Sequence, residues 1–247
     1  YSWVINLSYK CKTTQVSILE FKNKMEPFLK NGDDILYLSC ALALSGSLNT
    51  FQLVASQLQE EYPKSKIIGI DSTKANMALG LMAIDLSKLV NQGKPMDDLL
   101  KWVKDNRQFY NQVGSLETLT FLKAAGRVSG VSAFFGNLIG VKPMIMADIH
   151  GNNYVYTKVK GKTNSLIAAF DYVKKNMVEG VTDVVYIGQA MAKPQQAYLK
   201  ERIENELGLK TENFWIGPIV GISCGPGMFG VYFKGKEVRA DANGEEQ

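Results

Sequence analysis

Two apolar tetrapeptides, Ile35-Leu36-Tyr37-Leu38 and Ile67-Ile68-Gly69-Ile70, decide the fold of this chain. Each is a short apolar run of the kind that forms a buried strand. Between them the pattern predicts a helix from about Ser47 to Tyr62, which Pro63 ends. Because a strand, a helix and a second strand follow one another, we expect a parallel pair of strands joined by a crossover helix.

The same alternation extends along the chain on both sides of this unit. A capping-box pattern at Ser17-Ile18-Leu19-Glu20 opens a predicted helix that ends at Asn31-Gly32. Further helices are predicted at 75–92, from Pro95, at 163–178 and at 194–207, and strands at 142–149, 153–160, 184–188, 213–217 and 228–233. We expect a break near 111–116 that separates two α/β domains, residues 1–112 and 113–247. The predicted fold class is α/β, with a parallel sheet in the first unit and a mixed sheet in the second.

Composition narrows the class of protein. The 247 residues are 46% hydrophobic and 21% charged, and the 28 basic and 24 acidic residues leave a dispersed net charge of +4. This charge does not favour nucleic acid, which binds a clustered basic surface. Three cysteines without metal-ligand spacing indicate reduced thiols and a cytoplasmic protein without a metal or cofactor. No apolar run has the length of a membrane span and no signal-peptide pattern opens the chain, so we expect no stable membrane insertion.

Hydroxyl and glycine residues follow the first predicted strand. Ser45-Gly46-Ser47 lies at the start of the predicted helix, where free backbone amides can bind an anion. A simple helix cap at Ser47 explains the same residues, and spacing alone favours the cap. Thr13 and Thr14 precede another helix and, taken alone, form an ordinary loop. Together these segments supply donors without a catalytic base, which indicates that an anionic head group is bound rather than cleaved.

Two later segments offer further donors. Arg127 follows a predicted helix end at Ala125-Gly126, where its guanidinium can pair with a carboxylate or a phosphate, or form an ordinary surface ion pair. Gly225-Pro226-Gly227 begins a GxGxxG spacing, but a strand follows it where a dinucleotide site would open a helix. The alternative interpretation is a tight glycine turn whose backbone amides lie near an anion. The single histidine, His150, lies in a predicted turn, so neither a histidine relay nor a histidine zinc site is expected.

In this order and spacing, the segments resemble the DegV family of fatty-acid-binding proteins, which includes the acyl-binding subunits of bacterial fatty acid kinase. The matching segments span about residues 12–235 and are Thr13-Thr14-Gln15, Leu44-Ser45-Gly46-Ser47, Asp71-Ser72, Ala125-Gly126-Arg127-Val128-Ser129, Gly140-Val141-Lys142-Pro143 and Ser223-Cys224-Gly225-Pro226-Gly227. The resemblance implies a two-domain α/β architecture of the DegV type, with an acyl chain buried between or beneath the domains.

The resemblance also implies roles for individual residues. Thr13 and Ser45 would hold the carboxylate of a long-chain fatty acid, with Gly46 and Arg127 beside it. The surrounding head-group or phosphate region would comprise Thr14, Ser47, Ser223, Gly225 and Gly227. Hydrophobic residues that could line the acyl tunnel are Phe134, Phe135, Met144 and Met146, although core packing explains them equally well.

Three departures from the family pattern bear on function. Ala41-Leu42 replaces a Ser-Ser pair before the turn, and the opening strand with its Asp-Ser motif is not found before Lys12. Ser223 replaces the histidine of the glycine turn, which is associated with phosphate handling in the kinase subunits. Lipid binding is therefore better supported than phosphotransfer.

Three functions follow as hypotheses. The first is a non-enzymatic fatty-acid carrier that presents its ligand to a separate ATP-dependent kinase subunit, since the chain has no nucleotide motif of its own. The second is a serine hydrolase of acyl esters with Ser45 as nucleophile, which no nearby base supports. The third is a lipid-sensing regulatory module that is read by a protein partner.

Overall fold

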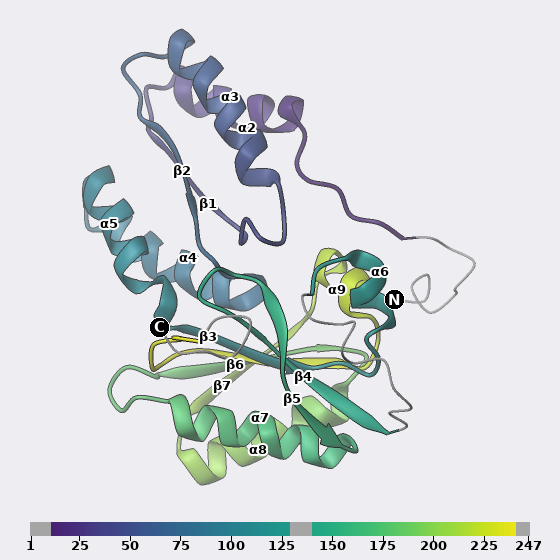
Figure 1. Ribbon diagram of the computed structural model, residues 1–247. Helices are drawn as coiled ribbons and strands as arrows, with labels where there is room; N and C mark the ends of the chain where they lie inside the picture. Colours follow the sequence, from purple (N-terminus) through teal and green to yellow (C-terminus); the bar gives the residue numbers. More distant parts are fainter. Residues whose placement is uncertain (1–10, 129–139, 241–247) are drawn as a thin grey trace.

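The computed structural model describes residues 11–128 and 140–240 of the chain (Figure 1). The helices are α2 (Ile18–Lys30), α3 (Ser47–Glu61), α4 (Asn76–Asn91), α5 (Met96–Asn106), the 3-10 turn η1 (Arg107–Phe109), α6 (Thr120–Ala125), α7 (Lys162–Asn176), α8 (Lys193–Leu207) and α9 (Pro218–Cys224). The strands are β1 (Ile35–Ser39), β2 (Ile67–Asp71), β3 (Tyr110–Ser115), β4 (Val141–Ala147), β5 (Asn153–Lys160), β6 (Val184–Ala190), β7 (Lys210–Trp215) and β8 (Met228–Lys234).

A smaller lobe contains β1 and β2, which pair in parallel with Ile35 opposite Ile67. Helices α2 and α3 pack beside them, and the rings of Phe21, Tyr37 and Phe51 meet in the core of this lobe. The predicted capping box is confirmed, because Ser17 and Glu20 exchange hydrogen bonds at the start of α2. The parallel unit that opened the sequence prediction is therefore present.

A larger lobe is built on a six-stranded sheet with the order β5-β4-β3-β8-β6-β7. Only β6 and β7 pair in parallel, and the other neighbours are antiparallel. This is the predicted mixed sheet, and it confirms the α/β fold class.

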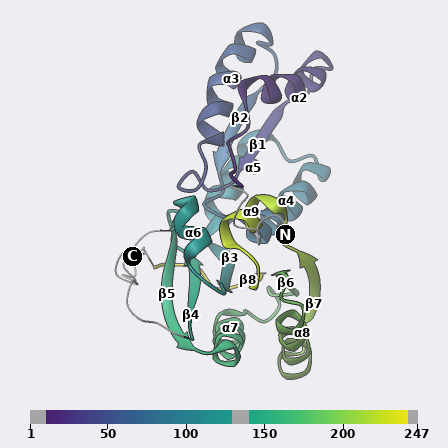
Figure 2. The same ribbon diagram turned by 90° about the vertical axis from the view of Figure 1, so that its right-hand side faces the viewer.

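The helices of the larger lobe form two layers. Figures 1 and 2 show α7 and α8 on the face of the sheet away from the smaller lobe, and α4, α6 and α9 on the opposite face. On that second face α4 packs on Tyr110 and Tyr232, while Leu122 of α6 joins a separate core cluster with Leu116 and Met228. The helical cover on this face therefore consists of two parts, with their own cores.

The chain has no break in its secondary structure at residues 111–115, because these residues belong to β3. All six residues of β3 pair with β8, and three of them also pair with β4. The segment Asn111-Gln112-Val113-Gly114-Ser115 has little intrinsic strand preference, so neighbouring strands on both sides hold it in the sheet. The boundary predicted between residues 112 and 113 falls inside this strand, and α4 packs on the larger sheet. We propose instead that the chain divides after β2.

Two smaller differences concern the end of the chain. The strand predicted at 213–217 is β7, which begins at Lys210 and ends at Trp215. Helix α9 was not predicted, because its sequence Pro-Ile-Val-Gly-Ile-Ser-Cys has seven residues and carries two poor helix formers.

Candidate functional site

The loop after β1 and the first turn of α3 form the centre of the site. Gly46 is the N-cap of α3 and has no side chain to bond the free amides of the first turn, which also contains no acidic residue. The Ser45 hydroxyl lies 3.0 Å from the Ser47 hydroxyl and accepts a 3.3 Å hydrogen bond from the Ser47 amide. The simple cap at Ser47 is therefore wrong, since Ser47 is the first helical residue. Hydroxyls and amides converge here on the positive end of the helix.

The segment that follows Thr13 and Thr14 lies against this turn. The Val16 amide donates to the Ser47 hydroxyl at 3.3 Å. The side-chain oxygen of Gln15 approaches the Gly46 Cα so closely that a Cβ at residue 46 would collide with it. A larger residue at position 46 would therefore require the flexible Gln15 side chain to move aside. The structure brings the first two sequence motifs together, and it leaves the assignment of Thr13 and Thr14 as carboxylate ligands a prediction.

Arg127 joins the same loop from a distant part of the sequence. Helix α6 ends at Gly126, whose φ of 67° is favourable for glycine, and the chain then turns so that Arg127 Nε donates to the Leu44 carbonyl at 3.2 Å. A second guanidinium nitrogen donates to the Ala125 carbonyl. A guanidinium carries five N–H donors, and these two bonds use two of them.

The loop between β2 and α4 is hydrogen-bonded to the loop that leads into the Ser45 turn. The Asp71 carboxylate accepts hydrogen bonds from the amides of Leu42 and Thr73, at 3.2 and 2.8 Å. The Ala41 amide donates to the Lys74 carbonyl at 2.9 Å. Thr73 has a φ of 53°, which is strained for a β-branched residue. Asp71, part of one of the segments that match the family, therefore positions the loop that follows β1. Its carboxylate is used in these backbone bonds and gives no sign of a second binding site.

Lys74 is buried, although a lysine in a loop is expected to lie at the surface. Its side chain is 1% exposed, and its ammonium group donates to the Gln108 side-chain oxygen at 3.1 Å. Burial, reinforced by the positive charge of Arg107 and opposed by Asp148, lowers the pKa of Lys74 to about 8. Gln108 in turn donates to the Ile149 carbonyl in the turn between β4 and β5. Lys74 thus connects the loop between β2 and α4 to η1 and, through Gln108, to the turn between β4 and β5.

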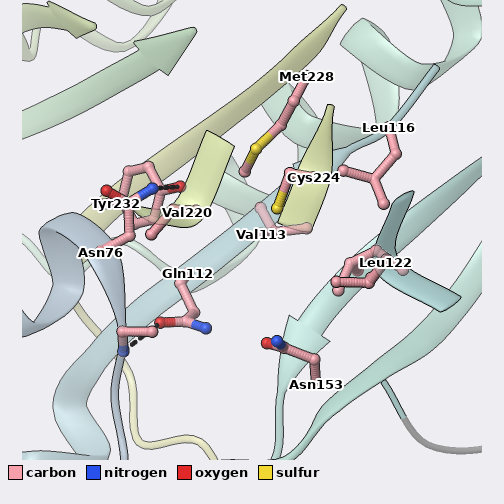
Figure 3. A pocket seen from close by; sticks show the side chains of 13 residues that line it. Asn76, Gln112, Val113, Leu116, Leu122, Asn153, Val220, Cys224, Met228 and Tyr232 are labelled. Carbon is pink, nitrogen blue, oxygen red and sulfur yellow. Dashed lines mark hydrogen bonds between the residues drawn. The ribbon is translucent and has the colours of Figure 1, made fainter. Parts of the chain in front are cut away.

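A cavity of about 70 Å³ lies next to this loop, on the face of the larger sheet that carries α4, α6 and α9 (Figure 3). It opens between the core under α4 and the core under α6 and α9. Its lining residues are Ala75, Asn76, Gln112, Val113, Gly114, Leu116, Leu122, Ile145, Asn153, Val220, Cys224, Met228 and Tyr232.

A chain of two hydrogen bonds connects the cavity to the Ser45 turn. The Asn153 side-chain amide, at the edge of the cavity, donates to the Arg127 carbonyl at 3.1 Å, and Arg127 reaches the Leu44 carbonyl. The carboxamides of Asn76, Gln112 and Asn153 make one end of the cavity polar, whereas Leu116, Leu122, Val220, Cys224 and Met228 make the other end apolar. Burial raises the pKa of the Cys224 thiol to about 12, which agrees with this apolar surrounding.

The glycine turn after α9 does not offer the free amides that the sequence suggested. The Gly225 amide donates to the Gly221 carbonyl at 2.8 Å, and the Gly227 amide to the Ala190 carbonyl at 2.6 Å. Gly225 has a φ of 76° and packs under the ring of Phe121 in α6. The turn therefore has a packing reason for its glycines. Ser223, one residue before the cavity-lining Cys224, stays a predicted head-group residue.

The predicted tunnel residues divide into two groups. Met144 and Met146 belong to the core on the other face of the sheet, with Phe170 and Val173, so their assignment to the tunnel is wrong. Ile145 between them faces the cavity, as the alternation of a strand requires. Phe134 and Phe135 lie outside the described residues.

Lys142, from the matching Val141-Lys142-Pro143 segment, forms an ion pair with Glu117 at 2.6 Å. Burial acts to raise the pKa of Glu117, but the hydrogen bond and charge of Lys142, aided by Lys162, outweigh it and leave that pKa lowered. This pair holds the β3–α6 connection against β4.

Sequence reasoning missed Asn76, Gln112 and Asn153 as site residues. Only their polar character within apolar surroundings could have marked them. Among residues 11–128 and 140–240, no three histidine, cysteine or carboxylate side chains gather as a metal site would require. The described helices include none that is both long and apolar enough to span a membrane.

Fold and site together define a two-lobed α/β protein in which two hydrogen bonds through Arg127 link a helix N-terminus with hydroxyl donors to a partly apolar cavity. The chain belongs to the DegV family: it matches the family model described as "Uncharacterised protein, DegV family" over residues 5–236.

Individual relatives agree with this membership. A DegV domain-containing protein of Clostridium perfringens is 29% identical over 224 residues, which cover 90% of this chain and 77% of the relative. Among solved structures, a fatty acid binding DegV family protein of Streptococcus agalactiae has a TM-score of 0.82 at 23% identity, covering 96% of this chain and 83% of the other. The Fatty Acid Kinase (Fak) B3 protein of Streptococcus pneumoniae, solved with linoleic acid, has a TM-score of 0.79 at 20% identity, with coverages of 91% and 78%. At these identities the two structures establish the shared fold.

Proposed function

We propose that this protein binds a long-chain fatty acid, with the carboxylate at the Ser45 turn and the acyl chain in the cavity. The observation that carries the proposal is the link through Arg127, whose two hydrogen bonds connect the donor-rich turn with the polar edge of the cavity. Thr13, Ser45, Gly46 and Arg127 are the proposed carboxylate ligands. The fatty-acid ligands named for the two solved DegV structures support a fatty acid as the ligand.

Energetics favour this arrangement. Each buried methylene contributes about 0.8 kcal/mol, so the acyl chain supplies most of the affinity. Desolvating the carboxylate opposes binding unless donors replace its water. The hydroxyls at residues 45 and 47, the first-turn amides of α3 and the guanidinium of Arg127 provide such donors.

The cavity as described is smaller than the roughly 300–1,000 Å³ of typical ligand pockets. We propose that a bound chain displaces lining side chains as it enters. Met228, at the apolar end, has the flexible side chain that such adjustment requires.

We further propose that the protein carries its ligand and does not transform it. The Ser45 hydroxyl is bonded to Ser47, and a nucleophile would need a base in that place. His150 is exposed in the turn between β4 and β5. The proposed protein partner is a separate ATP-dependent kinase subunit, and the proposed compartment is the cytoplasm, where the three free cysteines stay reduced.

Mass spectrometry of the denatured purified protein tests the binding proposal. We expect a fatty acid to be released in near-stoichiometric amount, and a protein free of lipid that also fails to bind added palmitic acid would refute the proposal. After delipidation, Ser45→Ala should weaken palmitate binding by about 10-fold, since a hydrogen bond to a charged group contributes about 1.5–3 kcal/mol. Ser56→Ala is the matched control, because Ser56 lies on the exposed side of the same helix.

An ester-hydrolysis assay distinguishes the carrier from the hydrolase. We expect no turnover of p-nitrophenyl esters above the solvent rate. Turnover that Ser45→Ala abolishes would replace the carrier proposal with a hydrolase.

A further inference from the structure

Gln112 is an unusual residue at the polar end of the cavity. It lies in β3, near the middle of the sheet, and is the one residue of that strand that is not buried. Its register partner on β8 is Tyr232, so both side chains are on the same face and both line the cavity. A long amide at this place in a central strand is not required by the fold.

The orientation of the Gln112 amide follows from one hydrogen bond. Its oxygen accepts from the Ala75 backbone amide at 3.3 Å, so its NH2 group points the other way. Figure 3 shows the nitrogen on the side away from this dashed bond, toward Asn153 across the cavity. The bond to Ala75 thus presents two N–H donors to the interior.

The neighbouring carboxamides are engaged with the protein. Asn76 donates to the Tyr232 hydroxyl at 2.7 Å, and Asn153 donates to the Arg127 carbonyl at 3.1 Å. Asn76 and Asn153 thus each commit an N–H to the protein, whereas the hydrogen bond of Gln112 engages only its oxygen and leaves its NH2 group directed at the space that a ligand would fill.

An unsubstituted acyl chain is a poor partner for these donors. In the ligand-free cavity, water can hydrate the Gln112 NH2 group. A plain hydrocarbon that displaced this water would leave the N–H groups without an acceptor, which is unfavourable. A ligand with an oxygen atom at this position would replace the water and keep the hydrogen bond.

We propose that the preferred ligand is an acyl carboxylate with a hydroxyl or oxo substituent, whose oxygen accepts a hydrogen bond from Gln112 Nε2. This inference rests on the proposed function. The polar end is the end nearest the Ser45 turn, because Asn153 there is bonded to Arg127. The substituent therefore lies toward the carboxyl end of the chain, and the remaining chain enters the apolar end.

Calorimetric titration of the delipidated protein with palmitic, 2-hydroxypalmitic, 3-hydroxypalmitic and 16-hydroxypalmitic acids tests this preference. We expect a 2- or 3-hydroxyl to improve the affinity about 10-fold over palmitate. The hydroxyl oxygen accepts a hydrogen bond from Gln112, so this donor does not stay unpaired in the complex. The 16-hydroxyl should bring no gain. Equal affinity for all four acids would overturn the inference and leave fatty-acid binding intact, whereas binding of none would overturn the proposed function itself.

Gln112→Met separates the role of this residue from a general preference of the site. The variant removes the donors but keeps the length of the side chain, so the gain in affinity of 3-hydroxypalmitate over palmitate should vanish. Gln57→Met, on the exposed side of α3, is the matched control. A preference that survives Gln112→Met, or an equal loss for palmitate and 3-hydroxypalmitate, would assign Gln112 no role with the substituent. The titrations of the unaltered protein remain decisive if the variant does not fold.

Discussion

Replacing Lys74 by methionine should make the protein more stable at neutral pH. The Lys74 ammonium is buried, with Arg107 adding repulsion and Asp148 giving partial compensation, and its pKa falls from 10.5 to about 8. A fall of this size corresponds to about 3 kcal/mol against the charged form. Methionine has a similar length and carries no charge, but it loses the hydrogen bond to Gln108, worth about 1 kcal/mol. We therefore expect Lys74→Met to raise the free energy of unfolding by about 2 kcal/mol at pH 7.

The pH dependence gives this prediction its sign. Between pH 8 and 10.5 the unfolded chain keeps the lysine proton while the folded protein has released it, so the stability of the unaltered protein rises with pH relative to the variant. The slope is at most about 1.4 kcal/mol per pH unit. The advantage of the methionine should therefore shrink from pH 8 upward, and above pH 10 the lost hydrogen bond should make the variant the less stable protein.

Urea unfolding at pH 7, 8, 9 and 10, followed by circular dichroism, measures this difference directly. Effects of alkaline pH on other groups cancel between the two proteins. Lys94→Met, at an exposed position, is the control for replacing a lysine by methionine. A Lys74→Met difference that stays constant from pH 7 to 10 would refute the reasoning from burial.

Three further predictions concern the packing around the site. Gly225→Ala should lower the free energy of unfolding by about 2 kcal/mol or more, because residue 225 has a φ of 76° and a Cβ would collide with the Phe121 ring; a loss under about 0.5 kcal/mol in urea unfolding would contradict this. Lys142→Met should cost about 1 kcal/mol at pH 7, since the Glu117 end of the pair is exposed. That loss should disappear in acid unfolding experiments as Glu117, whose pKa the pair lowers, becomes protonated, and a loss that persists at pH 3 would point to packing instead. The last prediction uses a variant in which the other two cysteines are serine. Cys224 should then react with a disulfide reagent at pH 8 at least about 100-fold more slowly than free cysteine, because burial raises its pKa to about 12. A rate near that of free cysteine would contradict a buried thiol.

Local patterns predicted the elements of the smaller lobe closely. The strand at 35–38, the helix from Ser47 and the strand at 67–70 all lie within a residue or so of their predicted ends. Apolar runs, a capping box and helix-ending residues act over a few positions, so they can be read before the fold is known. The loops of the candidate site were recognised for the same reason, since hydroxyls and glycine cluster at the start of α3.

Other features had no local signal. The residues of β3 look like a break, and they form a strand because β4 and β8 lie on either side of them. Lys74 would be placed at the surface by its charge, yet its side chain is 1% exposed and bonds to Gln108, 34 positions later. Arg127 is exposed in the structure, and only the fold shows that its guanidinium reaches the Leu44 carbonyl, 83 positions earlier.

The sequence by itself determined the class of fold, the order of most elements and the chemical character of the Ser45 turn, since each depends on residues close together in the chain. Only the tertiary structure decided where the cavity lies, which carboxamides face it and how Arg127 joins it to the turn. These features arise where α4, α6, α9 and the larger sheet meet, and contacts between distant segments leave no periodic pattern in the sequence.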